Sequence, residues 1–194
     1  IQVGVAARGL SPNRSWEFNV RQTGYDISSE AFGYPEPYYN PPMEALERIE
    51  VVRGAASLQY GTQFGGLLNY QIKKGTPYKA IRFETMQTVG SNGLFNSYNA
   101  IGGTYKDVSY YAYLHHRSAD GWRDNSRYNV LTGYLSLHYK LSNDLTIGAD
   151  YTSMDYQSQQ AGGLTDVKFN ENPRQSFRER NWFGTPWNVA SLYL

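Results

Sequence analysis

The chain has 194 residues, a net charge of +1 and no cysteine. These values exclude disulfide frameworks, thiolate metal sites and the strongly basic surface of a nucleic-acid-binding protein. Its 18 tyrosines, 4 tryptophans and 8 phenylalanines accompany a mean hydropathy of only −0.60. This combination suits either the wall of a transmembrane β-barrel or a carbohydrate-binding β-sandwich. No apolar run is long enough for a transmembrane helix.

The first part of the chain, residues 1–77, is interrupted by glycine and proline and predicts a compact α+β domain. A strand is expected at Ile1–Ala6. Pro42 suits the first turn of a helix, so a short helix is predicted at Met43–Arg48. Buried strands are predicted at Ile49–Val52 and Leu67–Ile72.

The remainder, residues 78–194, alternates apolar and polar side chains with a period of two, which is typical of two-faced antiparallel strands. Leu131, Leu135 and Leu137 lie on one face, for example, whereas Thr132 and Ser136 lie on the other. The predicted strands are Tyr78–Val89, Leu94–Tyr105, Val108–Arg117, Arg127–Leu141, Asp144–Tyr156 and one that includes Ser191–Leu194.

The predicted connections alternate in length, with tight turns at Lys106–Asp107 and Ser142–Asn143 and longer loops at Ser118–Ser126 and Gln157–Thr185. Strands of ten or more residues joined in this way favour an outer-membrane barrel over a sandwich. Five or six strands cannot close such a barrel, and both chain ends read as strand. We therefore expect an internal fragment of a longer protein.

Four strings of residues resemble the TonB-dependent outer-membrane transporters, in particular their ferric-citrate and siderophore receptor branch. Two are VAARGL and the overlapping RGLSPNRS, which together span residues 5–15. IEVVRGAASLQYGTQFGGLLNY at Ile49–Tyr70 resembles the end of the plug domain. In it, Gly54, Gly61, Gly65 and Gly66 permit positive φ and close backbone approach. LTDVKFNENPRQSFRERNWF at Leu164–Phe183 resembles an extracellular loop.

The resemblance implies a membrane β fold, namely a large antiparallel transmembrane barrel of about 22 strands with an α+β plug inside it. Residues 1–77 would be most of the plug, and residues 78–194 the first five to six barrel strands. It also implies active import of ferric citrate or a ferric siderophore across the Gram-negative outer membrane. The TonB complex would act through a missing upstream segment. The protein would contact lipid and lipopolysaccharide, bind no nucleic acid, catalyse no reaction and carry no intrinsic cofactor.

Candidate ligand residues follow from the resemblance and from the bidentate fit of arginine to carboxylates. Trp16, Glu17 and Phe18 depart from the small polar pattern expected for ferric citrate, which leaves room for a larger or more aromatic chelate. The plug-apex candidates are Asn13, Arg14, Trp16, Arg21, Tyr34, Tyr38 and Tyr39. The barrel-loop candidates are His115, Arg117, Trp122, Arg123, Arg174 and Arg178. A latch between plug and barrel is expected from Arg8, Arg53 and Glu84.

Adjacent His115 and His116 point to opposite faces of a strand, so no metal site is predicted. No catalytic set is recognisable. Two alternatives stay open. One is TonB-dependent import of cobalamin, another metal chelate or an oligosaccharide. The other is a secreted glycan-binding β-sandwich.

Overall fold

The computed structural model describes residues 4–6, 9, 15, 17–29, 38–53, 60 and 65–194. The chain divides into two compact units, Ile1–Lys73 and Lys74–Leu194. The boundary predicted from the sequence, between residues 77 and 78, lies slightly further along the chain. Each unit is described by itself below.

A four-stranded sheet forms the centre of the N-terminal unit, in the order β2-β1-β4-β3. β1 runs parallel to β4, and the other two pairings are antiparallel. The β1–β2 hairpin turns at Thr23 and Gly24, with φ of 47° and 91°. Two-residue hairpin turns favour such left-handed pairs because their twist matches that of the strands. The strands are β1 Phe18–Gln22, β2 Tyr25–Asp26, β3 Leu46–Val52 and β4 Gly66–Ile72.

Apolar side chains of β1 and β4, including Phe18, Val20 and Tyr70, are buried in this unit. Gly66 is required at the start of β4, since its φ is +112° and a Cβ there would lie 2.2 Å from the carbonyl oxygen of Val52. This close approach agrees with the role expected for Gly66. Two of the other glycines of that motif, Gly54 and Gly61, lie outside the described residues.

The helix predicted at Met43–Arg48 is wrong. Met43–Ala45 forms a single 3₁₀ turn, and Leu46 is already extended with φ −82° and ψ 137°. The β-branched Ile49 and Val51 pair with β4, and this ladder extends back to Leu46 through a bulge. The strands predicted at 49–52 and 67–72 are confirmed within β3 and β4. Residues 4–6 of the first predicted strand are not in a strand, and residues 1–3 lie outside the described part.

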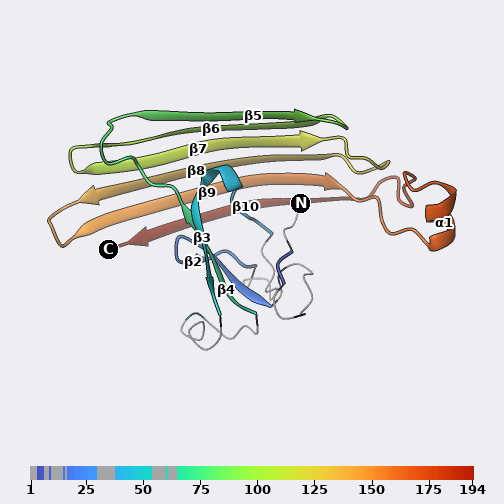
Figure 1. The fold of residues 1–194 in the computed structure, drawn as a ribbon, viewed down its shortest axis with the longest axis horizontal. Coiled ribbons are helices and arrows are strands. Elements are labelled where there is room, and N and C mark those ends of the chain that lie inside the picture. The colour runs from blue at the N-terminus through green and yellow to red at the C-terminus, as the bar shows by residue number, and fades with distance from the viewer. Residues whose placement is uncertain are drawn as a thin grey trace. The chain divides into compact units, whose positions relative to one another are not determined.

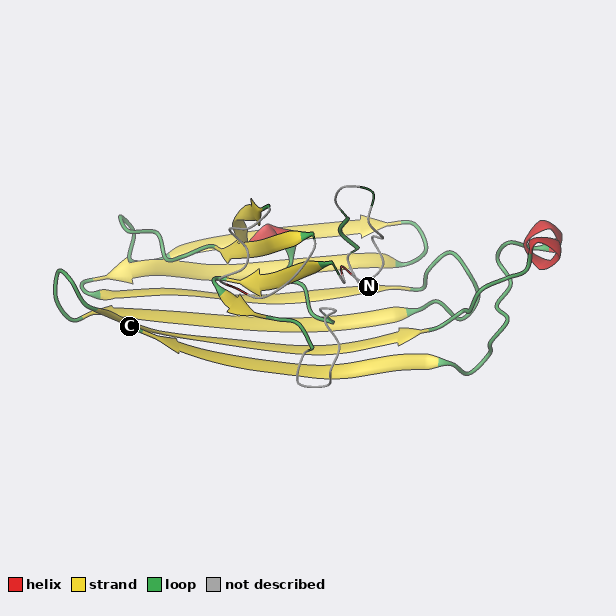
Figure 2. Ribbon diagram, turned by 90° about the horizontal axis from the view of Figure 1, so that it is seen from below, coloured by secondary structure: helices red, strands yellow, loops and turns green. Residues whose placement is uncertain are grey.

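The second unit is a six-stranded sheet in which each strand runs antiparallel to its neighbours, in the order β10-β9-β8-β7-β6-β5. Figures 1 and 2 show the strands lying side by side as long, gently curved ribbons. The strands are β5 Arg82–Gly90, β6 Leu94–Tyr105, β7 Val108–Ala119, β8 Tyr128–Lys140, β9 Thr146–Gln159 and β10 Trp182–Tyr193.

The connections of this sheet lie at two ends. Turns 106–107 and 141–145 join strands at one end, and connections 91–93, 120–127 and 160–181 lie at the other. The longest connection, 160–181, carries the short helix α1, Asp166–Glu171, capped by the Thr165 side chain. Figure 2 shows α1 beyond the ends of the strands. We call 120–127 the β7–β8 loop and 160–181 the β9–β10 loop.

The two faces of the sheet differ in the way a barrel wall requires. The outer face carries apolar side chains that are exposed, such as Phe83 at 73% and Leu135 at 44%. The inner face is rich in tyrosine and polar groups and is largely buried, as at Tyr98, Tyr134 and Thr152. Strands that contact lipid are expected to expose their apolar face.

The strand predicted near residue 191 begins much earlier, at Trp182, and the predicted loop 157–185 is correspondingly shorter. Gly184 and Pro186 are residues that usually interrupt strands. In the structure both lie within β10, where Pro186 pairs with Asp155 of β9.

Candidate functional site

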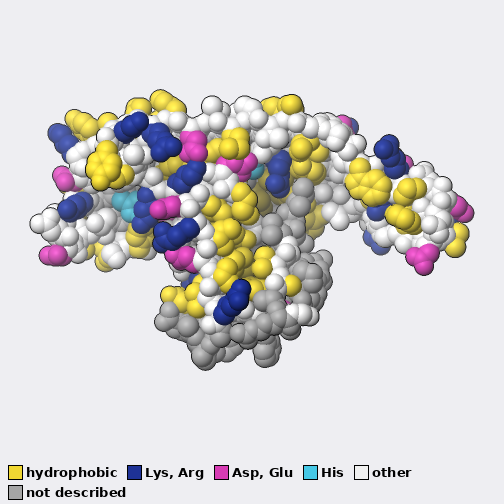
Figure 3. Space-filling model, viewed as in Figure 1, with side chains coloured by type: hydrophobic (Ala, Val, Ile, Leu, Met, Phe, Trp, Pro, Cys, Tyr) yellow, Lys and Arg dark blue, Asp and Glu magenta, His cyan; other side chains and the backbone are white. Residues whose placement is uncertain are grey.

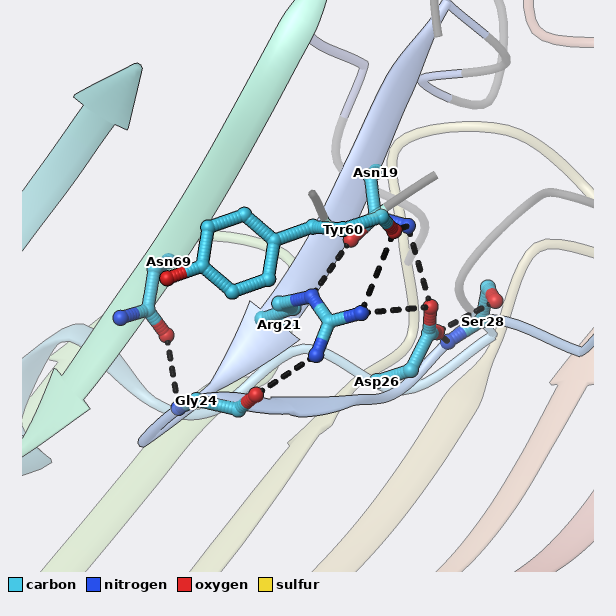
Figure 4. Close-up of polar contacts among 7 residues, drawn as sticks. All are labelled: Asn19, Arg21, Gly24, Asp26, Ser28, Tyr60 and Asn69. Atoms are coloured by element: carbon cyan, nitrogen blue, oxygen red, sulfur yellow. Dashed lines mark hydrogen bonds and ion pairs between the residues drawn. The ribbon is translucent and has the colours of Figure 1, made fainter. Parts of the chain in front are cut away.

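Arg21 is the centre of a polar cluster on the N-terminal sheet (Figure 4). Its Nε donates to Asn19 Oδ1 at 2.8 Å and its Nη1 to the Gly24 carbonyl at 2.7 Å. Its Nη2 reaches the Tyr60 carbonyl at 3.3 Å and lies 4.0 Å from Asp26 Oδ2, and the guanidinium carbon is 4.9 Å from the Tyr60 ring centroid. The guanidinium therefore connects the β1–β2 hairpin to Tyr60.

The cluster continues across the sheet through Asn69. Its Oδ1 accepts from the Gly24 amide at 3.0 Å, and its Nδ2 donates to Glu50 Oε2 at 2.8 Å. Gln71 donates to the same oxygen at 3.1 Å, and Arg48 Nε donates to Glu50 Oε1 at 2.8 Å. These hydrogen bonds, with that from Gln71 the largest influence, lower the pKa of Glu50 below its ordinary value.

Tyr39 is enclosed within the N-terminal unit. Its side chain is 0% exposed, and its hydroxyl donates to Gln22 Oε1 at 2.8 Å. Gln22 in turn donates to the Tyr25 hydroxyl. Neighbouring Tyr38 is partly exposed. Tyr39 therefore supports the sheet in this conformation and presents no surface to an external ligand.

The loops at one end of the second sheet carry exposed aromatic and basic side chains. Trp122 and Phe177 are both more than half exposed. Arg174 and Arg178 are exposed as well, whereas Arg123 donates to backbone carbonyls of the β9–β10 loop. Figure 3 shows basic, acidic and hydrophobic side chains together on the lobe around α1.

Tyrosine and histidine side chains form a continuous cluster on the inner face. The Tyr98 and Tyr111 hydroxyls lie 2.5 Å apart, and Tyr113 and Tyr134 stack with ring centroids 5.4 Å apart. His115 Nε2 lies 2.6 Å from Asn96 Oδ1. The cluster gives the inner face rigid aromatic rings with polar ends.

A second inner-face cluster joins three strands and was not anticipated from the sequence. The Tyr193 hydroxyl lies 2.8 Å from His138 Nε2 and 3.0 Å from Asp150 Oδ1. Its ring crosses Gly148, where a Cβ would lie 2.1 Å from a ring carbon. The only local signal was a glycine inside an alternating strand, which often marks a close approach.

In the described part of the chain, no three histidine, aspartate or glutamate side chains are grouped so that they could hold a metal ion. Among the described residues, no helix is long and apolar enough to cross a membrane.

Residues 2–67 match the family model of the TonB-dependent Receptor Plug Domain. The N-terminal unit therefore contains a TonB-dependent receptor plug domain. The match covers nearly the whole N-terminal unit, so this unit is the plug and its four-stranded sheet is the plug sheet.

Solved structures of two transporters and one receptor share the fold of this chain. The unliganded ferric citrate transporter FecA has a TM-score of 0.78 and 22% identity over 95% of this chain and 29% of its own. The copper transporter OprC has a TM-score of 0.65 and 18% identity, over 84% of this chain and 27% of its own. The pyoverdine receptor FpvA of Pseudomonas aeruginosa PAO1 has a TM-score of 0.61 and 24% identity, over 80% of this chain and 24% of its own.

The chain thus spans less than a third of the length of each of these proteins. The β5–β10 sheet corresponds to part of an outer-membrane β-barrel, which places the chain in the outer membrane of a Gram-negative bacterium.

The receptor's predicted plug-apex residues divide into two groups. Asn13, Arg14, Trp16 and Tyr34 lie outside the described residues. Arg21 and Tyr39 are engaged within the plug, as described above, and Tyr38 lies beside Tyr39. For the predicted latch, Arg8 also lies outside the described part, and Arg53 is exposed. Glu84 lies on the inner face, opposite Ala100.

The predicted barrel-loop residues of the receptor also lie in two places. His115 and Arg117 are on the inner face of β7, where the Arg117 guanidinium is 5.8 Å from the Tyr128 ring centroid. Trp122, Arg123, Arg174 and Arg178 lie in the β7–β8 and β9–β10 loops, which contact one another. The prediction that His115 and His116 face opposite ways is confirmed, because His116 pairs with Leu131 on the outer face.

Proposed function

We propose that the complete receptor imports an anionic ferric chelate, either ferric citrate or a siderophore, across the outer membrane with energy from the TonB complex. The observation that carries this proposal is the plug-domain match over residues 2–67. In this proposal the protein is a transporter and not an enzyme. The ferric chelate is its cargo and not a cofactor.

The β9–β10 loop carries four basic and three acidic residues, and its arginines support an anionic cargo. Arg174, Arg178 and Arg180 are exposed, and within the residues that the structure describes their guanidinium groups form no ion pair or hydrogen bond. Guanidinium groups bind carboxylates in a bidentate manner and keep their charge at all physiological pH values. Two of the similar structures, FecA and FpvA, are named for ferric citrate transport and pyoverdine reception.

Radiolabelled iron uptake tests the proposal directly. The full-length protein is expressed in cells that lack other ferric citrate receptors, and ferric citrate and a panel of ferric siderophores are supplied. We expect uptake of at least one ferric chelate above the empty-vector rate, lost when TonB is deleted. No ferric chelate uptake above that rate would refute the proposed cargo.

Copper import is the second candidate, favoured by the similarity in fold to the copper transporter OprC. Labelled copper supplied to the same cells distinguishes the two. Copper uptake that depends on TonB, without uptake of any ferric chelate, would favour this alternative. Cobalamin and an oligosaccharide belong in the same uptake panel because the plug match alone fits them equally.

A further inference from the structure

The β7–β8 loop holds the β9–β10 loop at both of its limbs. Arg123 Nη1 donates to the Gly162 carbonyl and its Nη2 to the Gln175 carbonyl, each at 2.9 Å. Gly162 precedes α1 and Gln175 follows it. One planar guanidinium therefore connects the two limbs of the loop, which matches the fixed fork of its donors.

Asn125 makes the second set of contacts. Its φ is 52°, a left-handed conformation that asparagine tolerates better than most residues. Its Nδ2 lies 3.1 Å from the Gln160 carbonyl, 2.6 Å from that of Arg178 and 3.2 Å from that of Asn181. The side chain thus reaches the start and the end of the β9–β10 loop.

All these acceptors are backbone carbonyls, so the contacts constrain the path of the loop itself. The loop is also closed internally, since the Gln160 amide donates to the Asn181 carbonyl at 2.8 Å and the Phe177 amide to the Ala161 carbonyl at 3.1 Å. Ordering a long loop costs conformational entropy, which such contacts offset before any ligand arrives.

The same contacts fix the backbone of the β9–β10 loop at Arg174 and Arg178. The Asp124 amide donates to the Arg174 carbonyl at 2.9 Å, and Asn125 binds the Arg178 carbonyl. The guanidinium groups of these two arginines have no polar partner within the described residues. Fixed backbones therefore carry unpaired charges at Arg174 and Arg178.

We propose that Arg123 and Asn125 are positioning residues, which hold the β9–β10 loop in one conformation whether or not cargo is bound. In this arrangement Arg174 and Arg178 stand ready for the carboxylate or other anionic groups of the chelate. The loop is a fixed wall of the receptor mouth and not a lid that closes on the cargo. The part of this inference that concerns cargo rests on the proposed function.

Trypsin digestion of the full-length receptor in outer-membrane vesicles tests the positioning role without any cargo. The β9–β10 loop contains the cleavage sites Lys168, Arg174, Arg178 and Arg180, and mass analysis of the fragments identifies cuts within it. Asn125→Asp keeps the shape and the left-handed backbone preference but removes both donors, and Arg123→Gln removes the bridging guanidinium. We expect cleavage of the loop to be at least tenfold faster in each variant.

Arg127→Gln is the matched control. It removes one positive charge from the same β7–β8 loop, but the Arg127 guanidinium binds Asp120 at 3.0 Å and not the β9–β10 loop. This control should be cleaved at the wild-type rate. Wild-type rates in Asn125→Asp and Arg123→Gln would overturn the inference. So would a wild-type loop that trypsin cuts rapidly without cargo and only slowly with it, because that behaviour defines a lid.

Binding of ferric citrate, measured by calorimetry on the purified receptor, tests the link to Arg174 and Arg178. Asn125→Asp should weaken binding about tenfold. Arg123→Lys retains one donor group and the charge, so it should weaken binding less than Arg123→Gln does. In an Arg174→Gln/Arg178→Gln background, Asn125→Asp should have little additional effect, because coupled residues are not additive. An equal effect in both backgrounds would overturn the link. A wild-type receptor that binds no ferric citrate would instead refute that cargo, while the trypsin rates still decide the positioning role.

Discussion

At the scale of single residues, the plug sheet is held together by polar side chains as well as by its apolar core. Arg21 and Glu50 each satisfy several partners on different strands. Such groups stabilise a sheet through hydrogen bonds in which one partner is charged. Each of these bonds contributes about 1.5–3 kcal/mol to stability when it is shielded from water and less when it is exposed.

Substituting Glu50 by Gln should make the plug sheet less stable at neutral pH. The lowered pKa means that the folded plug binds the ionised carboxylate more tightly than the unfolded chain does. Its contribution to stability is therefore fully present above pH 4.5, the ordinary pKa, and is lost as the pH falls through the lower pKa of the folded state. Because Glu50 is partly exposed, the contribution is at most about 1 kcal/mol. Amide exchange of β3 and β4 in the full-length receptor measures it, as up to about fivefold lower protection at pH 7.

The pH dependence separates this effect from a general loss of packing. The difference between wild type and Glu50→Gln should shrink below pH 4.5, where the protonated carboxyl resembles the amide. Glu47→Gln is the control, since Glu47 is exposed and lies 3.8 Å from Arg48 in a single ion pair. A difference that persists undiminished in acid would show that Glu50 does not act through its charge.

Substituting Arg21 by Lys tests whether this residue supports the plug or contacts cargo. Lysine keeps the charge but cannot bind Asn19, Gly24 and Tyr60 at once, so we expect about 1–2 kcal/mol lower local stability of β1 and β2. Amide exchange in the full-length receptor measures this loss. Unchanged protection together with weaker chelate binding would place Arg21 in the ligand site instead.

At the scale of strands, Gly148 links three elements that are distant in the sequence. It leaves space for the Tyr193 ring, which crosses from β10 over β9 to His138 on β8. Substitution by Ala should destabilise the barrel by about 1–3 kcal/mol, because the added carbon meets the ring. Urea unfolding of the full-length barrel in liposomes measures the change.

A double substitution shows whether the steric conflict is the cause. Gly148→Ala combined with Tyr193→Ala should be less destabilising than the sum of the two single changes. Gly133→Ala is the matched control, because the nearest side-chain atom to a Cβ at Gly133 is 4.0 Å away. Additive effects at Gly148 and Tyr193 would contradict the proposed contact.

Local signals predicted β6 and β7 closely, because alternation and a tight turn at Lys106–Asp107 are both written in consecutive residues. The start of β10 was not predicted, since ladder pairing to β9 overrides the proline at 186. The candidate site shows the same difference between local signals, which the sequence contains, and contacts between distant segments, which it does not. The position of Arg123 in a loop was predicted, but its carbonyl partners at Gly162 and Gln175 depend on a contact between loops that no sequence pattern indicates.

At the scale of the whole second unit, the outer face carries exposed apolar side chains on β7, β8 and β9, including Leu114, Leu135 and Tyr151. On β5 and β6 the same face also carries a hydrogen-bonded polar group of Thr85, Gln87, Ser97 and Asn99. Leu135 lies at the middle of β8, opposite Ala112 on β7 and Tyr151 on β9. Tyr139 lies on the same face near the short turn that follows β8. In a lipid-facing wall these two positions differ in depth, whereas on a soluble protein both would be ordinary surface sites.

Arginine at these positions should therefore have unequal effects on folding of the full-length barrel into bilayers. We expect Leu135→Arg to cost about 2–4 kcal/mol and Tyr139→Arg about 0–1 kcal/mol, because the cost of a charge falls from the midplane to the interface. Reversible folding into liposomes measures both values. Equal and small costs would contradict a lipid-facing outer face and would support the soluble sandwich, since an exposed leucine on a soluble surface tolerates arginine within about 0.5 kcal/mol.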